Sequence, residues 1–61
     1  MITVDKHDVG EAIPFKGKST DTKPKGYWYT EKIVNGSSFF EMDTQQVFFY
    51  DGDIEDWLPQ P

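Results

Sequence analysis

The chain has 61 residues, a net charge of −5 and no cysteine, so neither disulfide bonds nor thiolate metal sites can stabilise it. A chain of about 60 residues forms one domain at most and lies close to the lower limit of independent stability. No apolar run is long enough to cross a membrane, and we expect neither a membrane span nor a signal peptide.

The charged residues are unevenly distributed along the chain. All six lysines lie within the first 32 residues, and arginine is absent. From Ile33 onward there are six carboxylates and no basic residue. Because binding to nucleic-acid phosphates needs clustered basic side chains, we predict no direct contact with nucleic acid.

Residues 1–15 are predicted to form an N-terminal arm with one short strand. Ile2 and Val4 alternate with polar residues as in an extended strand, and the apolar stretch that follows contains Pro14. Because proline cannot donate a hydrogen bond to a ladder, a central strand is disfavoured there. Residues 16–26 consist mainly of lysines, small polar residues and turn formers, which predicts a flexible loop that buries almost nothing.

Residues 27–58 are predicted to form a β-meander. The segment 27–34 has strand-like composition and is followed by Asn35 and Gly36, a strong two-residue turn signal. Two β-prone runs separated by a short polar loop then predict a hairpin. No stretch of a dozen residues has apolar positions at helical spacing. The sequence therefore predicts an all-β fold, a small single-domain antiparallel meander of three to five strands.

The predicted hairpin carries aromatic residues on both faces. If its loop contains a bulge at Gln45, Phe40 faces Phe48 and Phe39 faces Phe49. A lone antiparallel sheet normally has one apolar and one polar face, so either the N-terminal arm or another protein should cover the second face. The candidate interface residues are the aromatic side chains of this region: Trp28, Phe39, Phe40, Phe48, Phe49, Tyr50 and Trp57.

Nothing in the sequence indicates an enzyme. The single histidine, His7, has no recognisable nucleophile motif and is interpreted as a solvated surface residue. A pair of catalytic carboxylates would need a cleft that so small a sheet can hardly enclose. The acidic turn at residues 51–56 lacks the spacing of a calcium loop. We therefore predict no catalytic residue, no metal site and no cofactor.

Several short motifs resemble a module of known proteins. Ser19–Pro24 reads Ser-Thr-Asp-Thr-Lys-Pro, and Asn35–Thr44 reads Asn-Gly-Ser-Ser-Phe-Phe-Glu-Met-Asp-Thr. Val47–Asp51, a run of β-prone residues, and then Trp57 complete the series. In order and spacing, these motifs resemble a short β-hairpin module of small structural proteins of tailed bacteriophages. The resemblance covers about residues 19–58.

The resemblance implies a virion-associated protein, such as a capsid decoration, head-fibre or tail-accessory component, that is assembled in the host cytoplasm and is commonly oligomeric. Such a protein would dock on capsid or tail proteins through its aromatic hairpin, with residues 16–26 facing solvent or a neighbouring subunit. The module usually has glycine where this chain has Gln45, so a positive φ there would carry strain.

Two other functions stay open. The acidic half of the chain would suit a small intracellular phage inhibitor that presents carboxylates to a basic, nucleic-acid-binding host protein. Its tryptophans and tyrosines would suit a carbohydrate-binding module that helps a phage adsorb, because aromatic rings stack on sugars.

Overall fold

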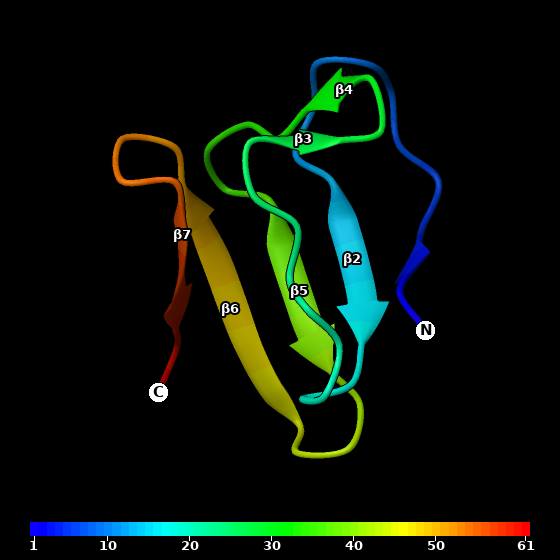
Figure 1. Ribbon diagram of the computed structural model, residues 1–61, viewed down its shortest axis with the longest axis vertical. Helices are drawn as coiled ribbons and strands as arrows, with labels where there is room; N and C mark the ends of the chain where they lie inside the picture. The colour runs from blue at the N-terminus through cyan, green and yellow to red at the C-terminus, as the bar shows by residue number, and fades with distance from the viewer.

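The computed structural model describes residues 1–61 as an all-strand fold without a helix (Figure 1). The larger sheet has five strands in the order β1-β2-β5-β6-β7, and β3 pairs with β4 in a separate two-stranded sheet. The all-β class predicted from the sequence is confirmed. The seven strands are β1 (Thr3–Val4), β2 (Pro14–Gly17), β3 (Tyr27–Trp28), β4 (Glu31–Lys32), β5 (Ser38–Glu41), β6 (Gln46–Asp51) and β7 (Asp56–Pro59).

The larger sheet is mixed, and here it differs from the predicted antiparallel meander. β2 and β5 run parallel with Phe15 opposite Phe39, whereas the other neighbouring strands are antiparallel. β2 takes this place because it brings the buried Phe15 ring onto Phe39, with ring centroids 6.4 Å apart. Parallel neighbours cannot be joined by a tight turn, so the chain between them, residues 18–37, must cross one face of the sheet.

Pro14 lies in β2, a central strand, although a proline was expected to disfavour one. β1 pairs only with Phe15 and Lys16, so Pro14 lies just beyond the end of that ladder. The Asp5 amide still donates to the Pro14 carbonyl at 3.0 Å. The missing amide hydrogen of Pro14 therefore removes only the return hydrogen bond, the one that the Asp5 carbonyl would have accepted.

The apolar core lies between the larger sheet and the chain that crosses it. Trp57 is at its centre, with its ring centroid 5.7 Å from that of Phe15, 5.9 Å from Phe39 and 5.0 Å from Tyr50. Tilted and edge-to-face contacts of this kind add to the free energy gained by burial. Figure 1 shows the crossing chain in front of β5. The buried apolar residues are Ile13, Phe15, Ile33, Phe39, Tyr50 and Trp57.

The β5–β6 hairpin is shifted by one residue from the predicted register. Phe39 pairs with Phe48 and Phe40 with Val47, because the loop holds residues 42–45 instead of a three-residue turn. Since side chains alternate between faces, the shift decides which aromatic rings share a face. Phe39 and Phe48 lie on the face that the crossing chain covers, and Phe40 and Val47 lie on the other.

The backbone of Gln45 has a φ of 61°, in the left-handed region that favours glycine. A residue with a Cβ in this conformation is strained by roughly 1 kcal/mol. We therefore expect Gln45→Gly to raise the free energy of unfolding by about 0.5–1 kcal/mol in urea denaturation. The control Gln46→Gly, in strand β6, should lower it. A loss of stability in Gln45→Gly would contradict the strain at this turn.

Candidate functional site

The two faces of the larger sheet differ in how they are covered. The inner face, which carries Phe15, Phe39 and Tyr50, is covered by the crossing chain. The outer face is the opposite one, and neither the crossing chain nor the N-terminal arm lies over it. The arm adds β1 to the edge of the sheet instead. Of the two covers expected from the sequence, the N-terminal arm or another protein, the arm is therefore not the one that covers the second face.

Three of the seven candidate interface residues belong to the core. Phe39, Tyr50 and Trp57 are 0%, 3% and 6% exposed and contact one another or their neighbours on the inner face. Their rings are packed inside the folded chain, which leaves little of their surface for a partner. Sequence alone could not place them, because the pairing of β2 with β5 that buries them is not local.

The other four candidate residues divide between the two faces. Trp28 and Phe48 are partly buried against the core, with the Trp28 ring edge-on to Phe15 at 5.3 Å. Phe40 and Phe49 lie on the outer face, and Phe49 is 43% exposed. Only these last two of the predicted residues present their rings on an uncovered part of the sheet.

Two aliphatic residues join Phe40 and Phe49 on the outer face. Val47 pairs with Phe40, and Leu58, which is 41% exposed, pairs with Phe49. We call Phe40, Val47, Phe49 and Leu58 the outer patch. The register of β6 with β5 and β7 brings these side chains together. Sequence reasoning missed Val47 and Leu58, because it considered aromatic residues and placed the hairpin one residue out of register.

The predicted flexible loop at residues 16–26 is part of the fold instead. Lys16 and Gly17 belong to β2, and residues 18–26 cover the inner face. The Lys23 ammonium lies 4.3 Å from the centroid of the Phe48 ring and 4.9 Å from that of Phe39. It also donates to Glu41 Oε2 at 2.5 Å, and the two side chains are only 17% and 8% exposed. The lysine therefore lies over the core as part of its cover.

Two backbone groups of this segment bind the polar atoms of core aromatic residues. The indole nitrogen of Trp57 donates to the Pro24 carbonyl at 2.8 Å, and the Gly26 amide donates to the Tyr50 hydroxyl at 2.9 Å. Buried tyrosine and tryptophan normally need such partners. The segment covers the core through polar contacts with aromatic rings rather than through apolar side chains of its own.

The environment of Glu41 lowers the pKa of its carboxyl. Lys23 donates to one carboxylate oxygen and the Thr44 hydroxyl to the other, and these bonds outweigh desolvation, which acts in the opposite direction. A group whose pKa is lowered by folding stabilises the fold above its unfolded pKa, here near 4.5. This contribution is lost as the pH falls through the folded value.

Lys23→Met should therefore destabilise the protein most near pH 7, because Glu41 would stay largely buried as a carboxylate without its cation. The difference from the wild type should shrink as the pH falls and Glu41 is protonated. The measurement is the urea midpoint, followed by tryptophan fluorescence, from about pH 3 to about pH 7, the range over which carboxylates titrate. Lys18→Met is the matched control, an exposed lysine of the same segment. Equal acid profiles for the two variants would contradict the role of Lys23.

Other carboxylates of the acidic half also help to hold the fold. Asp43 accepts hydrogen bonds from the Ser19 hydroxyl at 2.6 Å and the Ser19 amide at 2.9 Å, and these bonds lower the pKa of Asp43. Asp56 accepts from the Trp57 amide at 2.8 Å, which lowers the pKa of Asp56. With Glu41, and with Asp51, which accepts from the Asp53 amide at 2.9 Å, four of the six carboxylates after Ile33 serve internal contacts.

The edge of the sheet at β7 offers little to a strand of another chain. The Trp57 amide donates to the Asp56 side chain, and Pro59 has no amide hydrogen. Proteins protect exposed edges with prolines and local side-chain bonds of this kind. A partner protein is therefore better able to bind the face of the sheet than to pair a strand with this edge.

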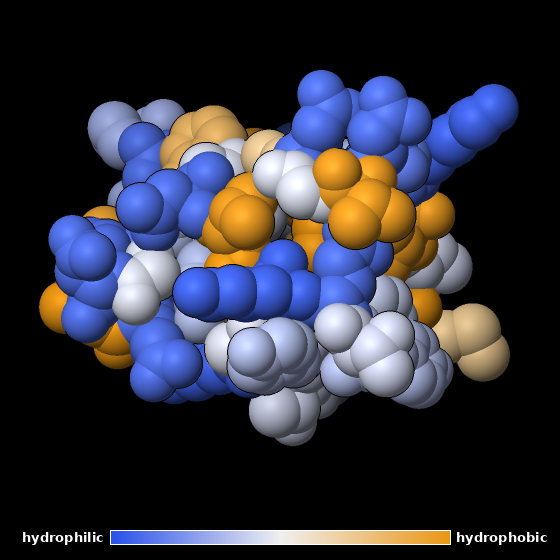
Figure 2. All heavy atoms as spheres, turned by 90° about the horizontal axis from the view of Figure 1, so that it is seen from above, coloured by the Kyte–Doolittle hydropathy of each residue, from blue (hydrophilic) through white to orange (hydrophobic).

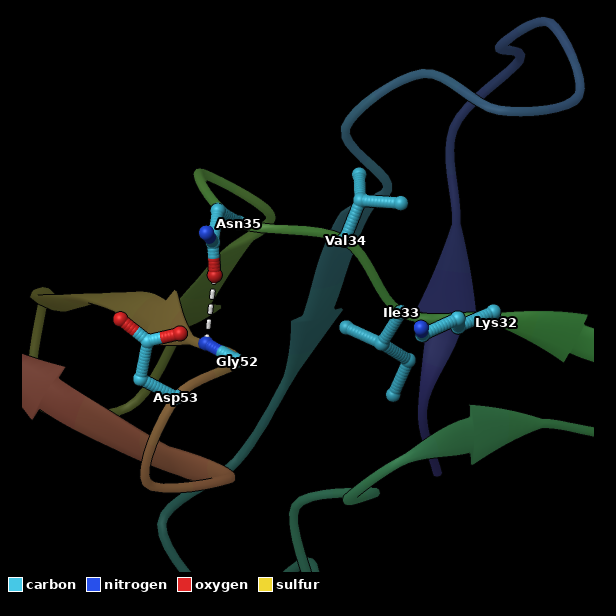
Figure 3. A pocket seen from close by; sticks show the side chains of 6 residues that line it. All are labelled: Lys32, Ile33, Val34, Asn35, Gly52 and Asp53. Atoms are coloured by element: carbon cyan, nitrogen blue, oxygen red, sulfur yellow. Dashed lines mark hydrogen bonds between the residues drawn. The ribbon is translucent and has the colours of Figure 1, made fainter.

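A cleft of about 310 Å³ lies between the β4–β5 connection and the β6–β7 turn (Figure 3). Asn35 Oδ1 accepts a hydrogen bond from the Gly52 amide across it, and its titratable side chains are Lys32 and Asp53. Viewed from this end, the molecule shows apolar side chains as separate groups among hydrophilic ones (Figure 2).

No three His, Cys, Asp or Glu side chains are grouped so that they could hold a metal ion. The structure also has no helix long and apolar enough to span a membrane.

Comparisons with known proteins identified no matching family model, no similar curated protein and no similar solved structure. The resemblance to the bacteriophage module therefore rests on the motifs themselves. In the fold, the motif at residues 19–24 contacts the motif at residues 35–44 through the Ser19–Asp43 bonds and the Lys23–Glu41 pair. These motifs form one structural unit, in which the first covers the strand that the second forms.

Proposed function

We propose that the protein is a non-enzymatic structural or accessory protein of a bacteriophage particle, which docks on a capsid or tail protein through its outer patch. The motif resemblance supports the virion setting. The observation that carries the docking role is the uncovered apolar face of the larger sheet. Self-association within the particle is part of the proposal, since the resemblance implies an oligomer.

The outer patch is apolar where a solvated sheet face would be polar. Phe49 and Leu58 expose about two fifths of their surfaces side by side, and Phe40 and Val47 adjoin them on the same face. Contiguous apolar surface of this kind marks interaction sites, and aromatic anchors at the centre of an interface contribute most of its free energy. The inner face needs no partner, because residues 18–26 already cover it.

The two alternative functions have less support. A carbohydrate-binding module would need exposed tryptophan or tyrosine rings. Trp57 is buried and Trp28 is packed edge-on against Phe15, which leaves Tyr27 and Tyr29 as the exposed rings. An acidic inhibitor would need free carboxylates, but several of those after Ile33 are engaged in internal contacts. The outer patch is the surface that neither alternative uses.

Quantitative mass spectrometry of gradient-purified virions and of lysate from infected cells tests the setting. We expect a stoichiometric copy number in the particle, because an accessory protein occupies repeated sites. Abundance in the lysate with absence from virions would contradict the proposal.

The docking face is tested by the double variant Phe49→Ser with Leu58→Ser. We expect it to change the free energy of unfolding by less than about 1 kcal/mol, because both side chains are partly exposed, and to reduce incorporation into virions strongly. Tyr27→Ser is the matched control, since Tyr27 is 61% exposed on β3, away from the outer face, and it should be incorporated normally. Normal incorporation of the double variant would exclude the outer patch as the docking site.

A further inference from the structure

His7 connects the N-terminal loop to the β3–β4 hairpin. Its side chain is only 16% exposed, although the sequence suggested a solvated histidine. Nδ1 lies 3.0 Å from the Asp5 carbonyl oxygen, and Nε2 lies 2.8 Å from Glu31 Oε2. The other hydrogen bonds of residues 6–12 are internal to the loop. His7 is therefore the residue that binds this loop to another element.

The first of these contacts follows from Pro14. Just beyond the end of the β1–β2 ladder, the Asp5 amide donates to the Pro14 carbonyl at 3.0 Å. An ordinary residue at position 14 would return a hydrogen bond to the Asp5 carbonyl, but proline has no amide hydrogen. The His7 ring takes the place of the missing donor, and because a carbonyl oxygen can only accept, Nδ1 is the donor to Asp5.

Both ring nitrogens of His7 face oxygen acceptors. A backbone carbonyl can only accept a hydrogen bond, and so can an ionised carboxylate such as that of Glu31. A neutral imidazole has one N–H group, so it can satisfy only one of them, whereas the imidazolium satisfies both. Accordingly, the Asp5 carbonyl and then the Glu31 carboxylate raise the pKa of His7, and burial opposes them.

We propose that His7 is a pH-sensitive clasp, which holds the N-terminal loop against the β3–β4 hairpin when doubly protonated and releases it on losing one proton. A cleft of about 350 Å³ lies between the two elements, lined by Val9 and Gly10 on one side and by residues 30–32 and Val34 on the other. Release of the clasp opens this cleft. The clasp rests on contacts separate from the outer patch and does not depend on the docking role.

The charged groups around the clasp favour the protonated form. Asp8 adds a favourable charge, while the Asp5 carboxylate is paired with Lys16 of β2 at 2.8 Å. Because folding raises the pKa of His7, the stabilisation is fully present below the unfolded value near 6.5 and is lost as the pH rises through the folded value. The charged residues of the elements in contact are Asp5, Lys6, Asp8, Glu11, Lys16, Glu31 and Lys32.

An NMR titration of the full chain from about pH 5 to about pH 9 tests the clasp, because it follows the imidazole and the loop amides together. We expect the His7 ring to titrate above 6.5 and the Val9 and Gly10 amide signals to shift with the same midpoint. Amides of β6, remote from the clasp, should not follow it.

Two variants separate the clasp from a general charge effect. Glu31→Gln should lower the midpoint of His7 toward its ordinary value and loosen the loop at lower pH. Glu11→Gln removes a carboxylate of the same loop that bonds the Asp8 amide and does not touch His7, so it should keep nearly the wild-type midpoint. A His7 midpoint at or below 6.5, or loop amides that do not follow the ring, would overturn the proposal.

Discussion

The parallel pairing of β2 with β5 determines how this short chain encloses a core. Two parallel neighbours require a connection that crosses the sheet, and in most proteins a helix with an apolar face makes that crossing. Here the crossing begins with residues 18–26, which are rich in lysine and small polar residues. They cover the core because Lys23 lies over two phenylalanine rings and pairs with Glu41, while backbone groups bind the polar atoms of Trp57 and Tyr50.

The same crossing explains why one face of the sheet stays open. The segment that connects β2 to β5 covers the inner face, and the N-terminal arm forms β1 at one edge of the sheet. Nothing is left for the outer face, although Phe49 and Leu58 lie there. In a chain of this size, an apolar surface left uncovered is a natural place for a partner. The proposed docking role therefore follows from topology rather than from a catalytic or ligand-binding pocket.

Local signals in the sequence predicted the local structure well. The alternation of β-prone residues gave the all-β class, the turn at Asn35 and Gly36 is present, and Gln45 has the positive φ expected for its position in the hairpin loop. Features that depend on contacts between residues far apart in the sequence could not be predicted from such local signals. The burial of Phe39 depends on the distant β2, and the cover that Lys23 provides depends on a carboxylate 18 residues away.

Predictions from composition were wrong for two polar residues that help to hold the fold, because both were expected to be solvated. Lysines and small residues normally indicate solvated loops, so nothing in the local sequence marks Lys23 as part of the core's cover. His7 is a similar case, because its partner Glu31 is 24 residues away and its other contact arises from the missing amide hydrogen of Pro14. In both cases the chain uses a buried or half-buried polar contact in place of the apolar side chains that it lacks.

Hydrogen exchange of the two indole N–H groups, followed by NMR, tests most directly whether residues 18–26 close the inner face. The Trp57 indole donates to the Pro24 carbonyl, whereas the Trp28 indole makes no hydrogen bond. We predict that the Trp57 indole proton exchanges far more slowly than that of Trp28, at a rate set by opening of the crossing segment. Equally fast exchange of both protons would show that the segment does not cover the core, and would contradict the account of how this chain closes its inner face.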